Sequence, residues 1–111
     1  MSESILESIK QMLGLDLEDQ SYDNELVVYI NSALSDLVQI GVGPTTGYQI
    51  TGKDDVWETL LEANPNLNSV KQFIYLKVRL VFDPPQTSYV IQAFEKQIEE
   101  ATFRINVHAE A

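Results

Sequence analysis

The chain has 111 residues, and its 17 acidic and 7 basic side chains give a formal net charge of −10. Hydrophobic residues make up 44% of the chain, with five glycines and four prolines, so we expect one folded domain over residues 1–111 rather than a disordered polypeptide. Such an acidic surface repels phosphate backbones, which excludes tight wrapping on nucleic acid, and no apolar run reaches the roughly 20 residues that a membrane-spanning helix needs.

Two amphipathic helices are predicted in the first 40 residues. Ser4 followed by Glu7 fits a capping box, with Ser2 as an alternative, slightly earlier start. Apolar residues on one face predict a helix over 3–13 that stops at Gly14. An acidic connector, LDLEDQSYDNE, follows at 15–25, and Ser21 or Asp23 can cap the next helix. That helix is predicted over 22–40, with Gly41 ending it, because one face repeats at steps of three and four: Leu26, Ile30, Ala33, Leu37 and Ile40.

The segment 41–53, GVGPTTGYQITGK, is rich in glycine and only its YQIT has strand character. We interpret it as a long loop that becomes ordered on contact with something else, since such loops are unusual in compact domains. Asp55 with Glu58 again resembles a helix cap, so DVWETLLEA predicts a short helix carrying Trp57.

The segment SVKQFIYLKVRLVF leaves two structures open. Its apolar residues alternate as in a strand, but they also fit helical spacing, and the length and the Asn64-Pro65 start favour a central helix that is apolar nearly all round. Pro84 and Pro85 end this segment near Asp83, because proline lacks a backbone donor and restricts the residue before it. Residues 87–106 then give the clearest amphipathic helix, and the whole predicts an all-α bundle of four to five helices with one long glycine-rich loop.

Each candidate catalytic or cofactor-binding motif in the sequence lacks residues that the chemistry requires. Residues 47–53 satisfy G-x-x-x-x-G-K, but Asp54 stands where a P-loop needs a hydroxyl, and no buried strand precedes it. The aspartates of 16–23 lack EF-hand spacing, and Glu95, Glu99 and Glu100 lie off the apolar stripe without a Glu-x-x-His partner, since His108 is the chain's one histidine. With no cysteine either, we expect no enzyme, no cofactor and no metal site.

Lys77 and Arg79 lie on the mostly apolar predicted helix and need an explanation. Charges there must reach solvent, pair with a carboxylate or await a partner. One interpretation is that both side chains extend to water. The other is that they form ion pairs across a subunit contact, where the acidic first half of a second copy supplies the carboxylates.

Three stretches resemble the head–tail connector, or adaptor, proteins of tailed bacteriophages and related prophages: QIGVGP after the second helix, YLKVRLVFDPP, and QIEEATFRIN in the last helix. The resemblance extends over nearly the whole chain. It implies a small all-α structural protein in which YLKVRLVF is helical, with no catalytic residues. It also implies a ring of about a dozen copies beneath the portal of the virion, at the head–tail junction, after assembly in the bacterial host cytoplasm.

In this interpretation the partners are further copies of the chain, the portal protein and the next connector or tail protein, with DNA only passing through the channel. We expect Asp83, Pro84 and Pro85 to set the angle between two helices that form ring contacts. Lys77 and Arg79 are candidate residues of these contacts. From the glycine-rich loop we add Gly43, Tyr48 and Ile50 as candidate contact residues. The alternative is a small helical regulatory module that binds a cytoplasmic protein through the central apolar helix.

Overall fold

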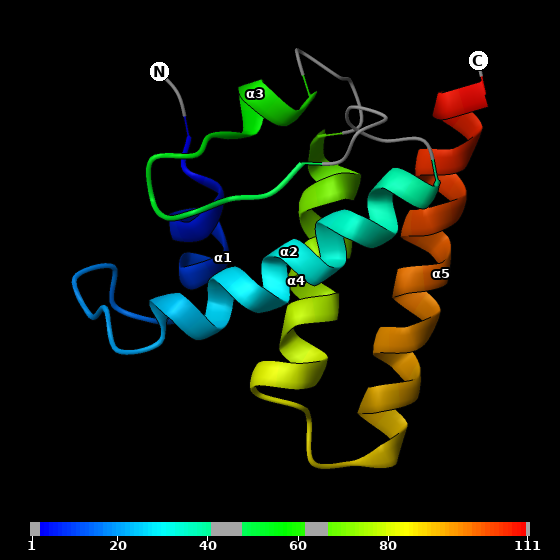
Figure 1. The fold of residues 1–111 in the computed structure, drawn as a ribbon. Helices are drawn as coiled ribbons and strands as arrows, with labels where there is room; N and C mark the ends of the chain where they lie inside the picture. The colour runs from blue at the N-terminus through cyan, green and yellow to red at the C-terminus, as the bar shows by residue number, and fades with distance from the viewer. Residues whose placement is uncertain (1–2, 41–47, 62–66, 111) are drawn as a thin grey trace.

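The computed structural model describes residues 3–40, 48–61 and 67–110, and most of these residues lie in helices (Figure 1). The helices are α1 (Ile5–Met12), α2 (Asp23–Gln39), α3 (Trp57–Leu61), α4 (Leu67–Phe82) and α5 (Ser88–Glu110). Within the described ranges there is no strand beyond an isolated bridge between Ser4 and Val56. The prediction of an all-α fold is therefore confirmed, whereas residues 41–47 of the predicted glycine-rich loop, including Gly43, lie outside the described residues.

Helix α1 begins and ends as its sequence predicts. Ser4 is the N-cap, and its Oγ accepts a 3.2 Å hydrogen bond from the N–H of Glu7. At the other end Gly14 has a φ of +79°, a left-handed conformation that costs glycine little. This turn lets the N–H groups of Gly14 and Leu15 reach the carbonyls of Gln11 and Lys10, the arrangement of a Schellman motif.

Helix α2 has the predicted extent but not the predicted cap. Tyr22 is its N-cap residue and makes no side-chain capping bond. The Asp23 carboxylate instead forms an ion pair with Lys10, whose Nζ lies 2.8 Å from Asp23 Oδ1. The Tyr22 ring packs edge-on against the Phe82 ring, with the ring centroids 5.2 Å apart. Capping by Ser21 or Asp23 is thus wrong, because a tertiary ion pair and an aromatic contact define the start of this helix.

The N-terminal segment and the segment before α3 run side by side. The N–H of Ile5 donates to the carbonyl of Asp55 at 3.0 Å, and the N–H of Trp57 donates to the carbonyl of Glu3 at 3.1 Å. The Asp55 carboxylate accepts a 2.7 Å hydrogen bond from the N–H of Thr51 and so closes a turn. The prediction that Asp55 caps α3 is therefore wrong. Trp57 is almost fully buried, and its indole N–H donates to Ser8 Oγ at 3.0 Å.

Helix α4 occupies the centre of the fold and packs against α1, α2 and α5. This settles the strand-or-helix ambiguity in favour of the helix, because a helix surrounded by three others needs apolar residues on most of its sides. Its buried side chains are Val70, Phe73, Ile74, Leu76 and Val78. Helix α5 runs antiparallel to α4, and α2 crosses the pair (Figure 1). Helix α5 extends beyond the predicted end at 106, and its residues Ala101 and Ile105 are buried in the common core.

Candidate assembly surface

Lys77 ties α4 to α2 of the same chain. Its Nζ lies 3.0 Å from Asp36 Oδ2, and the ammonium also lies 5.5 Å from the centre of the Phe73 ring. The lysine is partly exposed, with 37% of its side chain accessible. In the single chain Lys77 therefore has an intramolecular ion pair, so a contact with another copy would have to share or replace it.

Arg79 joins the end of α4 to the turn and to α5. Its Nε donates to the backbone carbonyl of Asp83 at 2.6 Å and lies 3.7 Å from the Asp83 carboxylate. Its Nη1 donates to the hydroxyl of Tyr75 at 3.1 Å, and the guanidinium lies 5.6 Å from the centre of the Phe94 ring on α5. Because the planar guanidinium offers several fixed donors, a single side chain holds the last turn of α4 and its neighbour helix together.

The double proline lies where the chain reverses between α4 and α5. Helix α4 ends at Phe82, and its last turn is completed by the N–H of Asp83, which donates to the carbonyl of Arg79 at 3.1 Å. Asp83 and Pro84 are exposed, and Pro85 is half-buried. The predicted end of this helix near Asp83 is confirmed. We name Asp83, Pro84 and Pro85 the corner.

Tyr48 and Ile50 lie away from the corner. The side chain of Ile50 is buried in the chain's own core, and Asn31 holds its backbone on both sides: the Ile50 N–H donates to Asn31 Oδ1 at 2.7 Å, and Asn31 Nδ2 donates to the Ile50 carbonyl at 3.1 Å. Figure 1 shows this segment near the start of α4, whereas the corner follows its end. The predicted contact residues thus fall into two separate groups, and their role in contacts between copies stays a prediction.

The Tyr48 hydroxyl is buried without a hydrogen-bond partner among the described residues. Burial raises the pKa of this phenol, and the nearby Asp55 carboxylate adds to the effect. The hydroxyl is therefore neutral and available as a hydrogen-bond donor.

Sequence reasoning missed Lys10, which organises the connection between α1 and α2. Only 2% of this residue is exposed, and its Nζ donates to the carbonyls of Leu17 and Asp19, at 3.1 and 2.7 Å, and to Asp23 Oδ1, at 2.8 Å. The signal was present in the sequence, because Lys10 is the lone basic residue among residues 1–52 and shares a helix face with Leu6 and Leu13. An ammonium has three donors, and here all of them are used.

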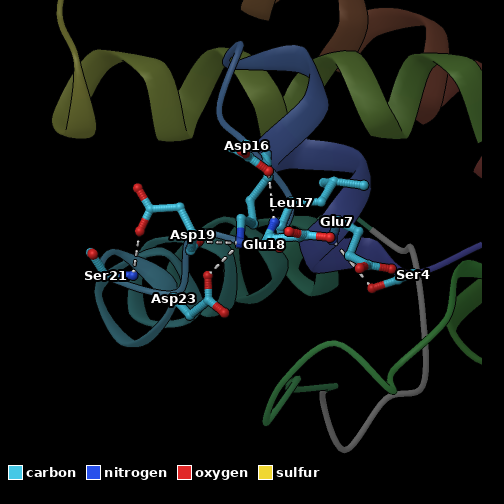
Figure 2. Close-up of polar contacts among 9 residues, drawn as sticks. Ser4, Glu7, Asp16, Leu17, Glu18, Asp19, Ser21 and Asp23 are labelled. Atoms are coloured by element: carbon cyan, nitrogen blue, oxygen red, sulfur yellow. Dashed lines mark hydrogen bonds and ion pairs between the residues drawn. The ribbon is translucent and has the colours of Figure 1, made fainter.

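The loop that Lys10 holds carries three exposed carboxylates, those of Asp16, Glu18 and Asp19. We name residues 15–22 the acidic lobe. Asp16 Oδ1 accepts from the N–H of Glu18, and Asp19 Oδ1 accepts from the N–H of Ser21, both at 2.9 Å (Figure 2). The hydrogen bonds from Ser21 hold the pKa of Asp19 below its usual value. Asp16, Glu18 and Asp19 have no ion pair to any described residue, so the lobe presents concentrated negative charge to solvent.

The described residues offer no group of three or more His, Asp or Glu side chains placed to hold a metal ion. Nor is any helix of these residues long and apolar enough to cross a membrane. The described residues do form a helical hairpin, α4 with α5, on one side of the fold and the acidic lobe on the other (Figure 1).

Comparison with known protein families identifies a match for this chain. The model of the family described as "Phage connector protein" matches residues 5–111, which is nearly the whole chain. No curated protein and no solved structure matches the chain. The match agrees with the resemblance carried by the loop after α2, the end of α4 and the last part of α5. The chain therefore belongs to the phage connector protein family, whose members are structural components of the virion that interact with other head and tail proteins.

Proposed function

We propose that the chain is a head–tail connector whose copies form a ring beneath the portal. The ring extends the DNA channel and provides a platform for the next connector or tail protein. The observation that carries this proposal is the match of the connector family over residues 5–111. The all-α fold with its fixed α4–α5 hairpin supports it.

A ring of identical subunits needs one subunit shape. Contacts between unlike faces close into a ring only when each copy is rotated by the correct angle relative to the last. The angle between α4 and α5 is fixed by the restricted backbone of Pro84 and Pro85 and by Arg79, which contacts both the Asp83 carbonyl and the Phe94 ring. Asp83 and Pro84 are exposed and free to meet a neighbouring copy. The corner thus both shapes the subunit and contributes to the contact.

The acidic lobe belongs, in this proposal, to the surface that lines the channel. Exposed carboxylates repel the DNA backbone, and a ring repeats that charge in every copy. DNA then passes without adhering to the wall.

Electron microscopy of the purified protein, alone and mixed with its portal protein, tests the proposal. We expect rings at high concentration, or rings on the portal where the isolated protein stays monomeric. Capsids that lack the portal serve as the control and should bind no copies. If the protein neither self-associates nor binds the portal under any condition, the proposed function is wrong.

A further inference from the structure

The outer face of α5 carries the two most exposed large hydrophobic side chains among the described residues. Tyr89 is 80% exposed and Phe103 is 70% exposed. Between them lie Ala93, Lys96 and Glu100, at steps of four, three, four and three residues, so all five positions share one face of the helix. The buried residues Ala101 and Ile105 lie on the opposite face, toward α4. We name Tyr89, Ala93, Lys96, Glu100 and Phe103 the outer stripe.

Helix α5 therefore carries exposed aromatic side chains on a second face, away from the one that packs on α4. A helix at the edge of a small fold needs one apolar stripe to pack on its neighbour, and α5 uses that stripe against α4. A second stripe, with an aromatic residue near each end, has no partner within the described chain. Large aromatic side chains are favoured at contacts between proteins, because each removes a large area from water with few rotatable bonds.

The charges on the outer stripe balance, unlike those on the rest of the molecule. Lys96 has no ion pair to any described residue, and Glu100 has only a long, exposed contact of 3.9 Å with Arg104. The chain as a whole carries a net charge of −10, so two copies repel each other on most approaches. A stripe with one free cation and one weakly paired anion is a face where identical copies meet without that repulsion.

We propose that the outer stripe binds the same stripe of a second copy, with the two α5 helices antiparallel. In the register that places Lys96 opposite Glu100 of the second copy, symmetry forms this ion pair twice. The same register places Phe103 opposite Ala93 of the second copy, a large side chain on a small one. A parallel pair would instead set lysine beside lysine and glutamate beside glutamate, which is unfavourable.

A surface depression supports this register. It is lined by Glu99, Glu100, Phe103 and Arg104 on α5. Lys96 of the second copy lies opposite this depression in the antiparallel pair. Its apolar stem packs on the Phe103 ring, and its ammonium reaches the carboxylates of Glu99 and Glu100.

This contact is independent of the proposed ring. It joins the same surface of two copies and so closes at two, whereas a ring needs two different surfaces. The pair is therefore a dimer in solution, or a contact between two rings, and it holds whether or not the ring forms.

Sedimentation equilibrium of the full chain between about 1 µM and 1 mM tests the proposal. We expect the wild type to dimerise, and Lys96→Glu or Glu100→Lys to raise the dissociation constant at least about tenfold, since each places like charges opposite one another. The double variant Lys96→Glu/Glu100→Lys exchanges the two charges and should restore the wild-type value within about threefold. Phe103→Ser should weaken the dimer without a change in the circular dichroism spectrum.

Glu95→Lys is the matched control. It changes the net charge by the same amount as Glu100→Lys, but it lies on α5 outside the outer stripe, so the dissociation constant should stay near that of the wild type. The proposal is overturned if the wild type is monomeric throughout the concentration range. It is equally overturned if the double variant is as weak as the single ones, or if Glu95→Lys weakens the dimer as much as Glu100→Lys does.

Discussion

The Nζ atom of Lys10 lies 2.8 Å from Oδ1 of Asp23, and only 2% of the lysine side chain is exposed, against 26% of the aspartate side chain. Two backbone carbonyls, those of Leu17 and Asp19, complete the set of acceptors. A fully buried ammonium is tolerated only when its hydrogen bonds are all made. The lysine thereby fixes the path of the acidic lobe and the start of α2.

Replacing Lys10 with methionine should destabilise the chain by about 2–4 kcal/mol. The substitution preserves most of the side-chain volume, so the loss comes from the ion pair and from the two carbonyls left without their donor. Urea unfolding followed by circular dichroism at pH 7 measures the change. Lys53→Met is the control, since Lys53 is exposed and has no ion pair to a described residue, and it should change the free energy of unfolding by less than about 0.5 kcal/mol. An equal effect of the two substitutions would contradict the structural role of Lys10.

Glu3 predicts a pH-dependent contribution to stability. The hydrogen bond from Lys71, at 2.7 Å, and then that from Ser8, at 2.9 Å, hold the pKa of the Glu3 carboxyl below its ordinary value of 4.5. Because the folded state favours the carboxylate, the contribution is complete at pH values above 4.5 and is lost as the pH falls through the lower folded-state pKa. The free energy of unfolding of the wild type should therefore exceed that of Glu3→Gln at pH 7, and the difference should shrink below about pH 4.

Urea titrations of both proteins between about pH 7 and pH 2.5 measure this difference. In a Lys71→Met background the substitution Glu3→Gln should have a smaller pH-dependent effect, since the strongest of the hydrogen bonds is already absent. Parallel stability curves for the wild type and Glu3→Gln over the whole pH range would show that these bonds do not contribute.

The sequence was most informative where local chemistry determines the structure. Ser4 and Glu7 marked the start of α1, Gly14 marked its end, and the double proline marked the end of α4, because caps, left-handed glycines and prolines act on the residues beside them. Each of these predictions is confirmed.

Long-range contacts account for the predictions that failed. The Asp55 side chain, predicted to cap α3, bonds to Thr51 instead, and Asp23, predicted to cap α2, pairs with a lysine 13 residues earlier in the chain. Ile50, a candidate contact residue, has its side chain in the core of its own chain, and its role in contacts between copies stays a prediction. Short polar side chains and isolated apolar residues have several possible partners, and only the packed fold selects among them.

The corner predicts a change in assembly that exceeds its change in stability. The double variant Pro84→Ala/Pro85→Ala gives the unfolded chain more freedom and should lower the free energy of unfolding by about 1 kcal/mol. It also loosens the angle between α4 and α5, so we expect rings of mixed copy number and lower thermal stability, which electron microscopy and mass measurement detect. Gln86→Ala, at the next, exposed position, is the control and should leave the rings unchanged. Rings of unchanged copy number and stability from the double variant would refute the role of the corner.

The acidic lobe predicts an effect on DNA that depends on salt. If Asp16 and Glu18 line the channel, the double variant Asp16→Lys/Glu18→Lys places cations against the DNA backbone in every copy. Ejection of DNA from virions should then slow, most strongly at low ionic strength, because added salt screens the new attraction over a distance of about 10 Å at 0.1 M. Asp54→Lys/Glu95→Lys changes the net charge equally at exposed positions outside the lobe and should leave ejection unchanged. Equal ejection rates for both variants and the wild type at every salt concentration would place the acidic lobe on the outside of the ring, where its carboxylates serve solubility alone.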